Sequence, residues 1–298
     1  MSLSYKNCNF CGRNCGVDRS LTTGYCGMTD KLYVARAALH FWEEPIISGR
    51  NGSGTIFFSG CSMKCIYCQN REISRGESGI FISTERLSEI MLELQSKGAN
   101  NINLVTPTHY AKTVIDAIEL AKKNGLIIPI VYNTSGYDSL ETLKSLKGSI
   151  DVYLADFKYY LNSTSSKYSS AFNYPETVKS AIDEMVRQTD VPVIDKNGIL
   201  KKGTVVRILL LPSHVAEAKL IVKYLWDKYG DKIYLSLMSQ YTPMENAPKP
   251  LDRRVTRSEY RELVEYAEKI GVTLGFTQDE TSQSDSFIPA FDNTGVIK

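Results

Sequence analysis

The strongest constraint on the fold is a repeated alternation between short apolar runs and longer segments with a helical pattern. The apolar runs are rich in β-branched and aromatic residues, and they predict strands at 55–59, 102–105, 127–132, 151–155, 204–211 and 233–238. Most of these runs are almost continuously apolar, which is typical of parallel strands that are covered on both faces.

Helical patterns fill the segments between the predicted strands. In the segment 85–97, apolar residues recur at the i, i+3, i+4 and i+7 spacing of one helix face. Thr256 and Glu259 have the spacing of a capping box at the start of another helix. Similar patterns predict helices at 85–97, 109–124, 138–147, 175–189, 215–229 and 256–270.

Six successive strand–helix units imply parallel strands joined by right-handed crossovers. A closed barrel needs eight such units. We therefore expect an α/β fold with a partial (β/α)6 TIM-like barrel, with a doubly wound sheet as the alternative. In both folds the ligand site lies at the C-terminal ends of the strands. Residues 1–50 lack the alternation, so we expect a cysteine-rich cap over 1–50 and the barrel with a C-terminal tail over 51–298.

Composition argues against several classes of function. The net charge is only +2, so we expect no nucleic-acid partner. No window of about 18 consecutive apolar residues predicts a membrane span. The N-terminus lacks the apolar core of a secretory signal, so we expect a cytoplasmic protein with reduced thiols. Its seven cysteines then indicate metal ligands or reactive thiols more than disulfides.

Three of the cysteines, Cys61, Cys65 and Cys68, lie in a loop directly after the first predicted strand. A [4Fe–4S] cluster normally takes four cysteine ligands, so three would leave one iron open to a ligand from outside the protein. A catalytic zinc with three protein ligands is the alternative, although such sites usually include histidine or glutamate. Tyr67 precedes the third cysteine and is placed to pack beside that outside ligand.

This loop, with an aromatic residue before its third cysteine, resembles the signature of the radical S-adenosylmethionine (SAM) superfamily. The resemblance covers roughly residues 50–280. It extends to the pyruvate formate-lyase activating enzyme-like proteins with a cysteine-rich N-terminus, with which the chain shares NLVTPTHY and SLMSQYTP. It implies that the open iron binds the amino and carboxylate groups of SAM. One electron then cleaves SAM to a 5′-deoxyadenosyl radical, which abstracts hydrogen from the substrate.

The resemblance also implies partners and a departure from the family pattern. It implies an electron donor such as flavodoxin or ferredoxin, and either a protein substrate of the glycyl radical enzyme type or a small molecule. In the family, Gly-Gly-Glu-Pro ends the second strand and holds the SAM amino group. Here Thr106, Pro107 and Thr108 stand in its place, so their carbonyls or hydroxyls would have to serve. His109 is either a substrate contact or a solvent-exposed residue at a helix start.

The ends of the next two strands supply further SAM contacts that the resemblance implies. Asn133 and Ser135 correspond to the polar strand end near the SAM ribose, although the same residues suit a plain turn. Asp156 would accept from the methionine ammonium group and Lys158 would pair with the carboxylate. The alternative for these two residues is a solvated ion pair.

The last two strands contribute one charged and one apolar candidate. Arg207 interrupts an apolar strand, where an unpaired charge is costly. The resemblance implies that Arg207 contacts the SAM carboxylate, and a structural ion pair is the alternative. His214 is a weaker candidate of the same kind. Met238 would approach the adenine, or it fills the core as methionine often does.

The remaining cysteines form a group near the N-terminus, with glycine next to three of them. Glycine lets a backbone turn tightly around metal-bound thiolates. A structural zinc would fix a segment that is too small for its own core. An auxiliary [4Fe–4S] cluster would relay electrons or bind substrate. We favour zinc because all the ligands are local, and free structural cysteines are the third alternative. The ligands are Cys8, Cys11, Cys15 and Cys26.

A radical SAM enzyme is therefore the function that the sequence favours. The alternative from another class is a non-catalytic iron–sulfur electron carrier, but the sequence has no cysteine after Cys68 to complete the cage of such a carrier. The third hypothesis is a radical SAM enzyme that modifies a cofactor or a tRNA. The near-zero net charge and the lack of an evident RNA-binding appendage count against tRNA.

Overall fold

The computed structural model describes residues 3–278 and 289–297, and one large sheet organises them. The sheet order is β10-β9-β8-β6-β5-β4-β2-β1-β3, and from β2 to β10 each neighbouring pair is parallel. The parallel strands are β2 (Ser53–Phe58), β4 (Ile102–Val105), β5 (Ile130–Thr134), β6 (Val152–Asp156), β8 (Leu200–Leu209), β9 (Tyr234–Met238) and β10 (Gly275–Thr277).

These strands lie side by side in the order in which the chain makes them, so the sheet has no point where the winding direction reverses. A doubly wound sheet requires such a reversal. The α/β fold with an open, partial barrel is therefore confirmed, and the doubly wound alternative is wrong. All six strands predicted from the sequence are present, with shifts of a few residues at their ends.

Three strands that the sequence did not reveal pair antiparallel with their neighbours. β1 (Tyr33–His40) pairs antiparallel with β2 and with β3 (Ile80–Phe81). β7 (Val193–Ile194) pairs antiparallel with β8 and forms a hairpin with it. Residues 33–40 thus belong to the sheet, although they fall within the range predicted as a cap. The division of the chain into two domains stays a prediction.

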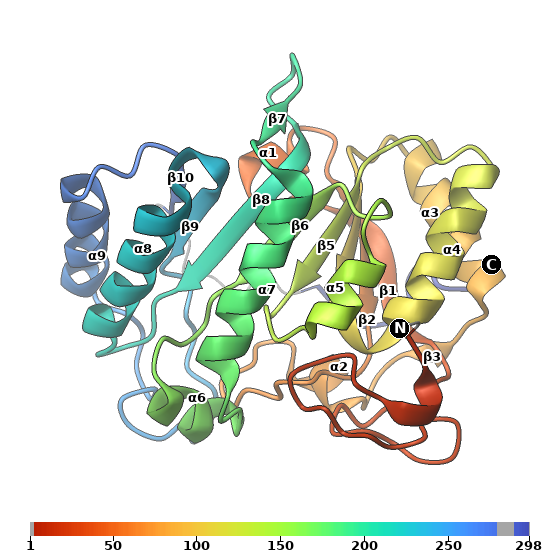
Figure 1. Ribbon diagram of the computed structural model, residues 1–298, viewed down its shortest axis with the longest axis horizontal. Helices are drawn as coiled ribbons and strands as arrows, with labels where there is room; N and C mark the ends of the chain where they lie inside the picture. The colour runs from red at the N-terminus through yellow and green to blue at the C-terminus, as the bar shows by residue number, and fades with distance from the viewer. Residues whose placement is uncertain (1–2, 279–288, 298) are drawn as a thin grey trace.

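Helices cover the outer face of the sheet, as Figure 1 shows. All six predicted helices are present, as α3 (Thr84–Ser96), α4 (Ala111–Lys123), α5 (Leu140–Ser145), α7 (Tyr174–Thr189), α8 (Val215–Tyr229) and α9 (Arg257–Lys269). Shorter elements complete the described part of the chain, namely η1 (Tyr5–Asn7), α1 (Pro45–Ser48), α2 (Arg71–Arg75), η2 (Thr108–Tyr110), α6 (Asn162–Ser169) and η3 (Gly230–Lys232). Within that part, no helix has both the length and the apolar character needed to cross a membrane.

The two faces of each parallel strand have different neighbours, because successive side chains point to opposite faces. Outward residues such as Leu104 and Tyr132 pack in one cluster with residues of α3 and α4. Inward residues such as Val131 and Leu154 pack around Ile47 of α1. Both faces are thus apolar over much of their length, which explains the continuous apolar runs.

The N-terminal segment lies at the end of the sheet to which the parallel strands point, next to α2 and α6 (Figure 1). Its backbone is tied to the loop after β5. The Gly12 amide donates to the Tyr137 carbonyl at 3.0 Å, and the Ser139 amide donates to the Phe10 carbonyl at 3.1 Å. The segment thus adjoins the end of the barrel where the sequence predicted the ligand site.

Candidate active site

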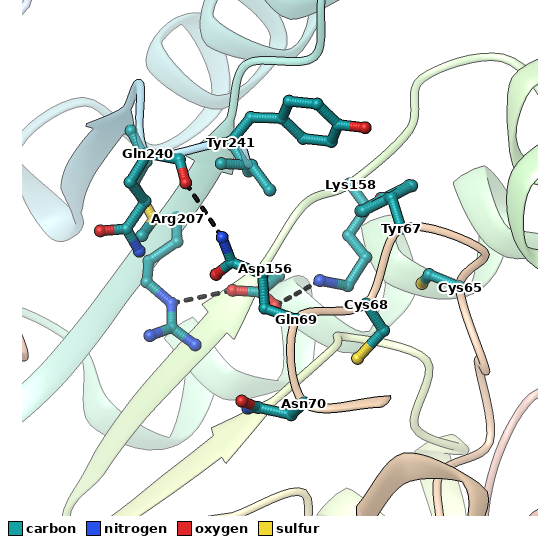
Figure 2. A pocket seen from close by; sticks show the side chains of 12 residues that line it. Cys65, Tyr67, Cys68, Gln69, Asn70, Asp156, Lys158, Arg207, Gln240 and Tyr241 are labelled. Atoms are coloured by element: carbon teal, nitrogen blue, oxygen red, sulfur yellow. Dashed lines mark hydrogen bonds and ion pairs between the residues drawn. The ribbon is translucent and has the colours of Figure 1, made fainter. Parts of the chain in front are cut away.

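A pocket opens at the C-terminal ends of β6, β8 and β9, facing the three-cysteine loop (Figure 2). Its volume is about 190 Å³. Residues predicted from the sequence make up more than half of its lining: Cys65, Tyr67, Cys68, Asp156, Lys158, Arg207 and Met238. The sequence did not single out the other lining residues, which are Gln69, Asn70, Leu209, Gln240 and Tyr241.

The three-cysteine loop is shaped by a glycine and by hydrogen bonds within the loop. Gly60 has φ of +88°, and a Cβ atom there would lie only 2.2 Å from a side-chain carbon of Met28. Glycine is therefore required at this turn. The Met63 amide donates to Cys61 Sγ at 3.3 Å, and the Cys68 amide donates to the Cys65 carbonyl at 3.1 Å. These bonds fold the loop tightly after β2.

Two cysteine thiols of this loop, those of Cys61 and Cys68, are poor acids in the absence of a metal. Burial raises the pKa of Cys61, and burial together with the charges of Cys65 and Cys61 raises the pKa of Cys68 to about 12. A cysteine binds a metal as its thiolate, so binding of a cluster would have to displace the thiol protons. Ser169 Oγ donates to Cys65 Sγ at 3.0 Å, a contact that suits a thiolate. The buried thiol of Cys65 and the partly buried thiols of Cys61 and Cys68, with donors aimed at two of the three, fit the ligand set of an iron–sulfur cluster.

Asp156 lies between two cations at the end of β6, as the dashed lines in Figure 2 show. Lys158 Nζ lies 2.6 Å from one carboxylate oxygen, and Arg207 Nε lies 2.8 Å from the other. Burial alone would raise the pKa of Asp156, but Arg207 and Lys158 outweigh it, so the pKa is lowered. With their side chains only 14–22% exposed, these residues do not form the solvated pair considered as an alternative.

No sequence pattern pointed to Glu43, which lies beneath Arg207 on the inner face of the barrel. Glu43 Oε2 accepts from Arg207 at 3.1 Å. Its other oxygen accepts from the Asn103 amide at 2.9 Å and from the Asn133 amide at 3.3 Å. Next to it, Glu44 is buried, and burial raises the pKa of its carboxyl group. A pair of glutamates before a proline gives no sequence signal for such a position.

Arg207 therefore takes part in a structural ion pair, the alternative that the sequence left open. Its third contact is a hydrogen bond from a terminal nitrogen to Asn133 Oδ1 at 2.6 Å. A guanidinium has five N–H donors, and these three contacts use three of them. Two donors remain for an anionic ligand, so the contact with a SAM carboxylate stays a prediction.

Five of the predicted SAM contacts do not line the pocket as the structure describes it: Thr106, Pro107, Thr108, Asn133 and Ser135. Thr106 has φ of +59°, which is an uncommon conformation for a β-branched residue. The Thr108 hydroxyl donates to Asp138 at 2.7 Å, and the Ser135 carbonyl accepts from the Tyr174 hydroxyl at 2.8 Å. Their roles toward SAM remain predictions that these contacts do not test.

The two histidine candidates also lie outside the pocket lining. His109 is 2% exposed and its Nε2 lies 2.7 Å from the Ser59 carbonyl oxygen, so the solvent-exposed alternative is wrong. Burial lowers the pKa of His109 to about 3, so the ring is neutral at pH 7. His214 Nδ1 lies 2.7 Å from the Pro212 carbonyl oxygen, and its Nε2 lies 3.4 Å from the Tyr168 hydroxyl.

The N-terminal cysteines lie close together. Burial raises the pKa of Cys11, and the nearby charges of Cys26, Cys15 and Cys8 raise it further. Gly24 lies between two of them, since a Cβ atom there would be 3.6 Å from Cys26 Sγ and 3.7 Å from Cys15 Sγ. In the described part of the chain, no three His, Cys, Asp or Glu side chains already form a closed cage. Metal binding at either cysteine group is therefore a proposal.

Arg19 lies fully buried beside these N-terminal cysteines. Its Nε donates to the Met28 carbonyl at 3.0 Å, and its terminal nitrogens donate to the carbonyls of Thr29 and His109. One terminal nitrogen also lies 4.0 Å from Cys8 Sγ. Among the described residues, no carboxylate forms an ion pair with Arg19, so the cysteine sulfurs are its nearest candidates for a counter-charge.

Comparison with known proteins adds a family to this geometry. The sequence profile of the Radical SAM superfamily matches residues 55–218, which is more than half of the chain. The protein MJ0674 of Methanocaldococcus jannaschii is 29% identical over 283 residues, which cover 91% of this chain and 77% of that protein.

Solved structures of SuiB from Streptococcus suis are also similar. The structure bound to S-adenosylmethionine gives a TM-score of 0.49 at 13% identity, over 74% of this chain and 48% of SuiB. The structure bound to the precursor peptide SuiA gives 0.49 at 12% identity, over 74% of this chain and 46% of SuiB. The chain thus spans about half the length of the SuiB structures that it matches.

Proposed function

The chain belongs to the radical SAM superfamily, and we propose that it binds a [4Fe–4S] cluster through Cys61, Cys65 and Cys68 and cleaves SAM reductively. One observation carries the proposal: the loop with three thiols faces a pocket whose opposite wall holds Lys158, Arg207 and Asp156. Two cations and a carboxylate are the charges that a ligand with both a carboxylate and an ammonium group needs. When bound, the cluster would supply one electron that breaks the C5′–S bond of SAM. The 5′-deoxyadenosyl radical would then take a hydrogen atom from the substrate.

The pocket offers a place for each part of SAM. Lys158 and the free donors of Arg207 would bind the methionine carboxylate, and Asp156 would accept from the methionine ammonium group. Tyr67 and Met238 line the same pocket and would contact the adenosine. The stretch directly after β4, residues 106–110, contains no glutamate, so we propose that Asp156 carries most of the amino-group recognition in this chain.

We propose a protein of the glycyl radical enzyme type as the substrate, with a small molecule as the alternative. The support is the resemblance to activating enzymes that the loop and the strand-end sequences carry. An electron donor such as flavodoxin or ferredoxin would reduce the cluster. Deuterium transfer from candidate substrates into 5′-deoxyadenosine would identify the substrate and its site of hydrogen abstraction.

An electron carrier remains the competing function, and electron paramagnetic resonance (EPR) separates the two. The reduced, iron-loaded protein is measured with and without SAM. An enzyme whose open iron binds SAM changes its spectrum on addition of SAM. A carrier with a completed cage shows the same spectrum in both samples, and that result would reject the proposed function.

For the N-terminal cysteines we propose a bound metal centre, because a buried guanidinium without a carboxylate needs another counter-charge. Thiolates of Cys8 and Cys26 beside Arg19 would supply it, and metal binding would keep them deprotonated. Both zinc and an auxiliary [4Fe–4S] cluster satisfy this requirement. Metal analysis of anaerobically purified protein decides between them. One zinc with about four iron atoms per chain supports zinc, and about eight iron atoms support the second cluster.

A further inference from the structure

Arg13, in the N-terminal segment, joins two parts of the chain that are far apart in the sequence. Its Nε donates to the Ser62 carbonyl at 2.8 Å, within the three-cysteine loop. Its terminal nitrogens donate to the Ser169 carbonyl at 2.7 Å and to the Ser170 carbonyl, at the end of α6. The guanidinium also lies 3.7 Å above the ring of Tyr25. One side chain thus holds the three-cysteine loop against α6.

Ser169 is the last residue of α6, and it contacts both Arg13 and a cysteine sulfur. Ser169 is 3% exposed, and its hydroxyl donates to Cys65 Sγ at 3.0 Å. The same hydroxyl oxygen lies 2.7 Å from the Tyr159 hydroxyl, which lies 2.7 Å from the Tyr67 hydroxyl. Three buried hydroxyl groups therefore form a chain from the pocket wall to the sulfur.

A hydrogen bond to a cluster sulfur favours the reduced state, because reduction adds one negative charge to the cluster and its thiolates. Hydrogen bonds to the sulfurs are among the factors that set iron–sulfur reduction potentials. The effect is strongest in a buried site, where little water competes for the sulfur. In this chain the Ser169 hydroxyl is such a donor, and its backbone is fixed by Arg13.

We propose that Ser169 is a positioning residue that raises the reduction potential of the cluster held by Cys61, Cys65 and Cys68, and that Arg13 keeps it in place. The inference rests on the proposed function, since it requires that cluster. No bond is made or broken in this step. One electron passes from an external one-electron donor to the cluster, and the hydroxyl stabilises the added charge. Because Arg13 belongs to the N-terminal segment, that segment contributes to the potential.

The test is an anaerobic redox titration of the iron-loaded full-length protein, followed by EPR. Ser169→Ala should shift the midpoint potential to more negative values. A tenfold change in the ratio of reduced to oxidised cluster at fixed potential corresponds to about 59 mV for a one-electron couple. We expect a shift of about this size. Ser169→Thr keeps the hydroxyl and should titrate like the wild type.

The matched control is Ser163→Ala, in the same helix. Ser163 is exposed and its side chain makes none of the bonds described above, so the potential should not move. Arg13→Ala should shift the potential in the same direction as Ser169→Ala. Arg13→Lys should not restore it, because one ammonium group cannot span the same set of carbonyls.

An iron-loaded Ser169→Ala protein that titrates like the wild type would overturn the inference. If that variant does not retain iron, Arg13→Ala replaces it as the test, because it releases the backbone that holds the Ser169 hydroxyl against Cys65. A wild-type potential in Arg13→Ala then overturns the inference, and a negative shift supports it. The titration measures only the midpoint potential of the cluster and needs no SAM cleavage. A failure of the proposed enzymatic activity shows itself in a different measurement, as the absence of 5′-deoxyadenosine.

Discussion

Glu43 gives the sharpest test of how this chain builds its active site. The residue lies outside the segment that matches the superfamily profile, yet its carboxylate accepts hydrogen bonds from Arg207, Asn103 and Asn133. The perturbation is Glu43→Gln, which keeps the shape and removes the charge. The two carboxylate oxygens of Glu43 face three N–H donors, whereas the glutamine amide offers one oxygen and one NH₂ group. In the variant, at least one of the three donors therefore faces the NH₂ group and loses its acceptor.

The magnitude follows from these contacts. Hydrogen bonds to charged groups contribute about 1.5–3 kcal/mol each. Losing both partners of a buried ion pair costs less than leaving one charge unpaired, which costs about 3–5 kcal/mol. Arg207 keeps Asp156 as a partner in the variant, so its charge is not left unpaired. The range for a hydrogen bond to a charged group therefore applies, and not the range for an unpaired buried charge. We expect Glu43→Gln to lower the free energy of unfolding by about 1.5–3 kcal/mol.

The assay is urea unfolding of anaerobically purified protein at pH 7, together with SAM binding by equilibrium dialysis. Glu119→Gln is the matched control, because Glu119 is exposed on α4. A double-mutant cycle with Arg207→Met should give a coupling energy of about 0.5–3 kcal/mol. SAM binding should also weaken, because Arg207 is no longer held under the pocket. If Glu43→Gln unfolds like Glu119→Gln and binds SAM normally, the proposed role of Glu43 is wrong.

Three further changes test other parts of the account. Cys65→Ala should abolish the EPR signal of the SAM-binding cluster, and retention of the full signal would contradict the ligand assignment. Asp156→Asn should weaken SAM binding about tenfold, which corresponds to about 1.4 kcal/mol, and an unchanged dissociation constant would exclude its role. Hydrogen bonds from Arg253 and the Thr256 amide hold the pKa of Glu259 at about 2, below its unfolded value of about 4.3. Its stabilisation is therefore present above pH 4.3 and is lost as the pH falls toward 2. Glu259→Gln should cost about 1 kcal/mol at pH 7 but little at pH 2, as urea unfolding at the two values will show.

The longer parallel strands could be predicted because the two faces of each strand are both buried, which makes continuous apolar runs. β1 was missed because five of its eight residues are only partly buried and its sequence includes Arg36, so no such run appears. β3 and β10 are only two and three residues long, too short for a pattern. An edge strand has a paired neighbour on one side only, so packing constrains its residue types less.

The site was predicted where its chemistry is local in sequence. Cys61, Cys65 and Cys68 are within one loop, and Asp156 and Lys158 are two residues apart. The contact between Glu43 and Arg207 joins residues 164 positions apart, and no local pattern predicts it. Ser169 was missed for the same reason, since its partner Cys65 is 104 positions away.

The most direct test of the central claim is the product formed from SAM by the iron-loaded, reduced protein. Anaerobically reconstituted protein is mixed with dithionite and SAM, and 5′-deoxyadenosine is quantified by liquid chromatography with mass detection. We predict 5′-deoxyadenosine and methionine in equal amounts from the wild type and none from Cys65→Ala. Absence of 5′-deoxyadenosine from cluster-replete wild-type protein would contradict the claim that the three-cysteine loop serves to cleave SAM.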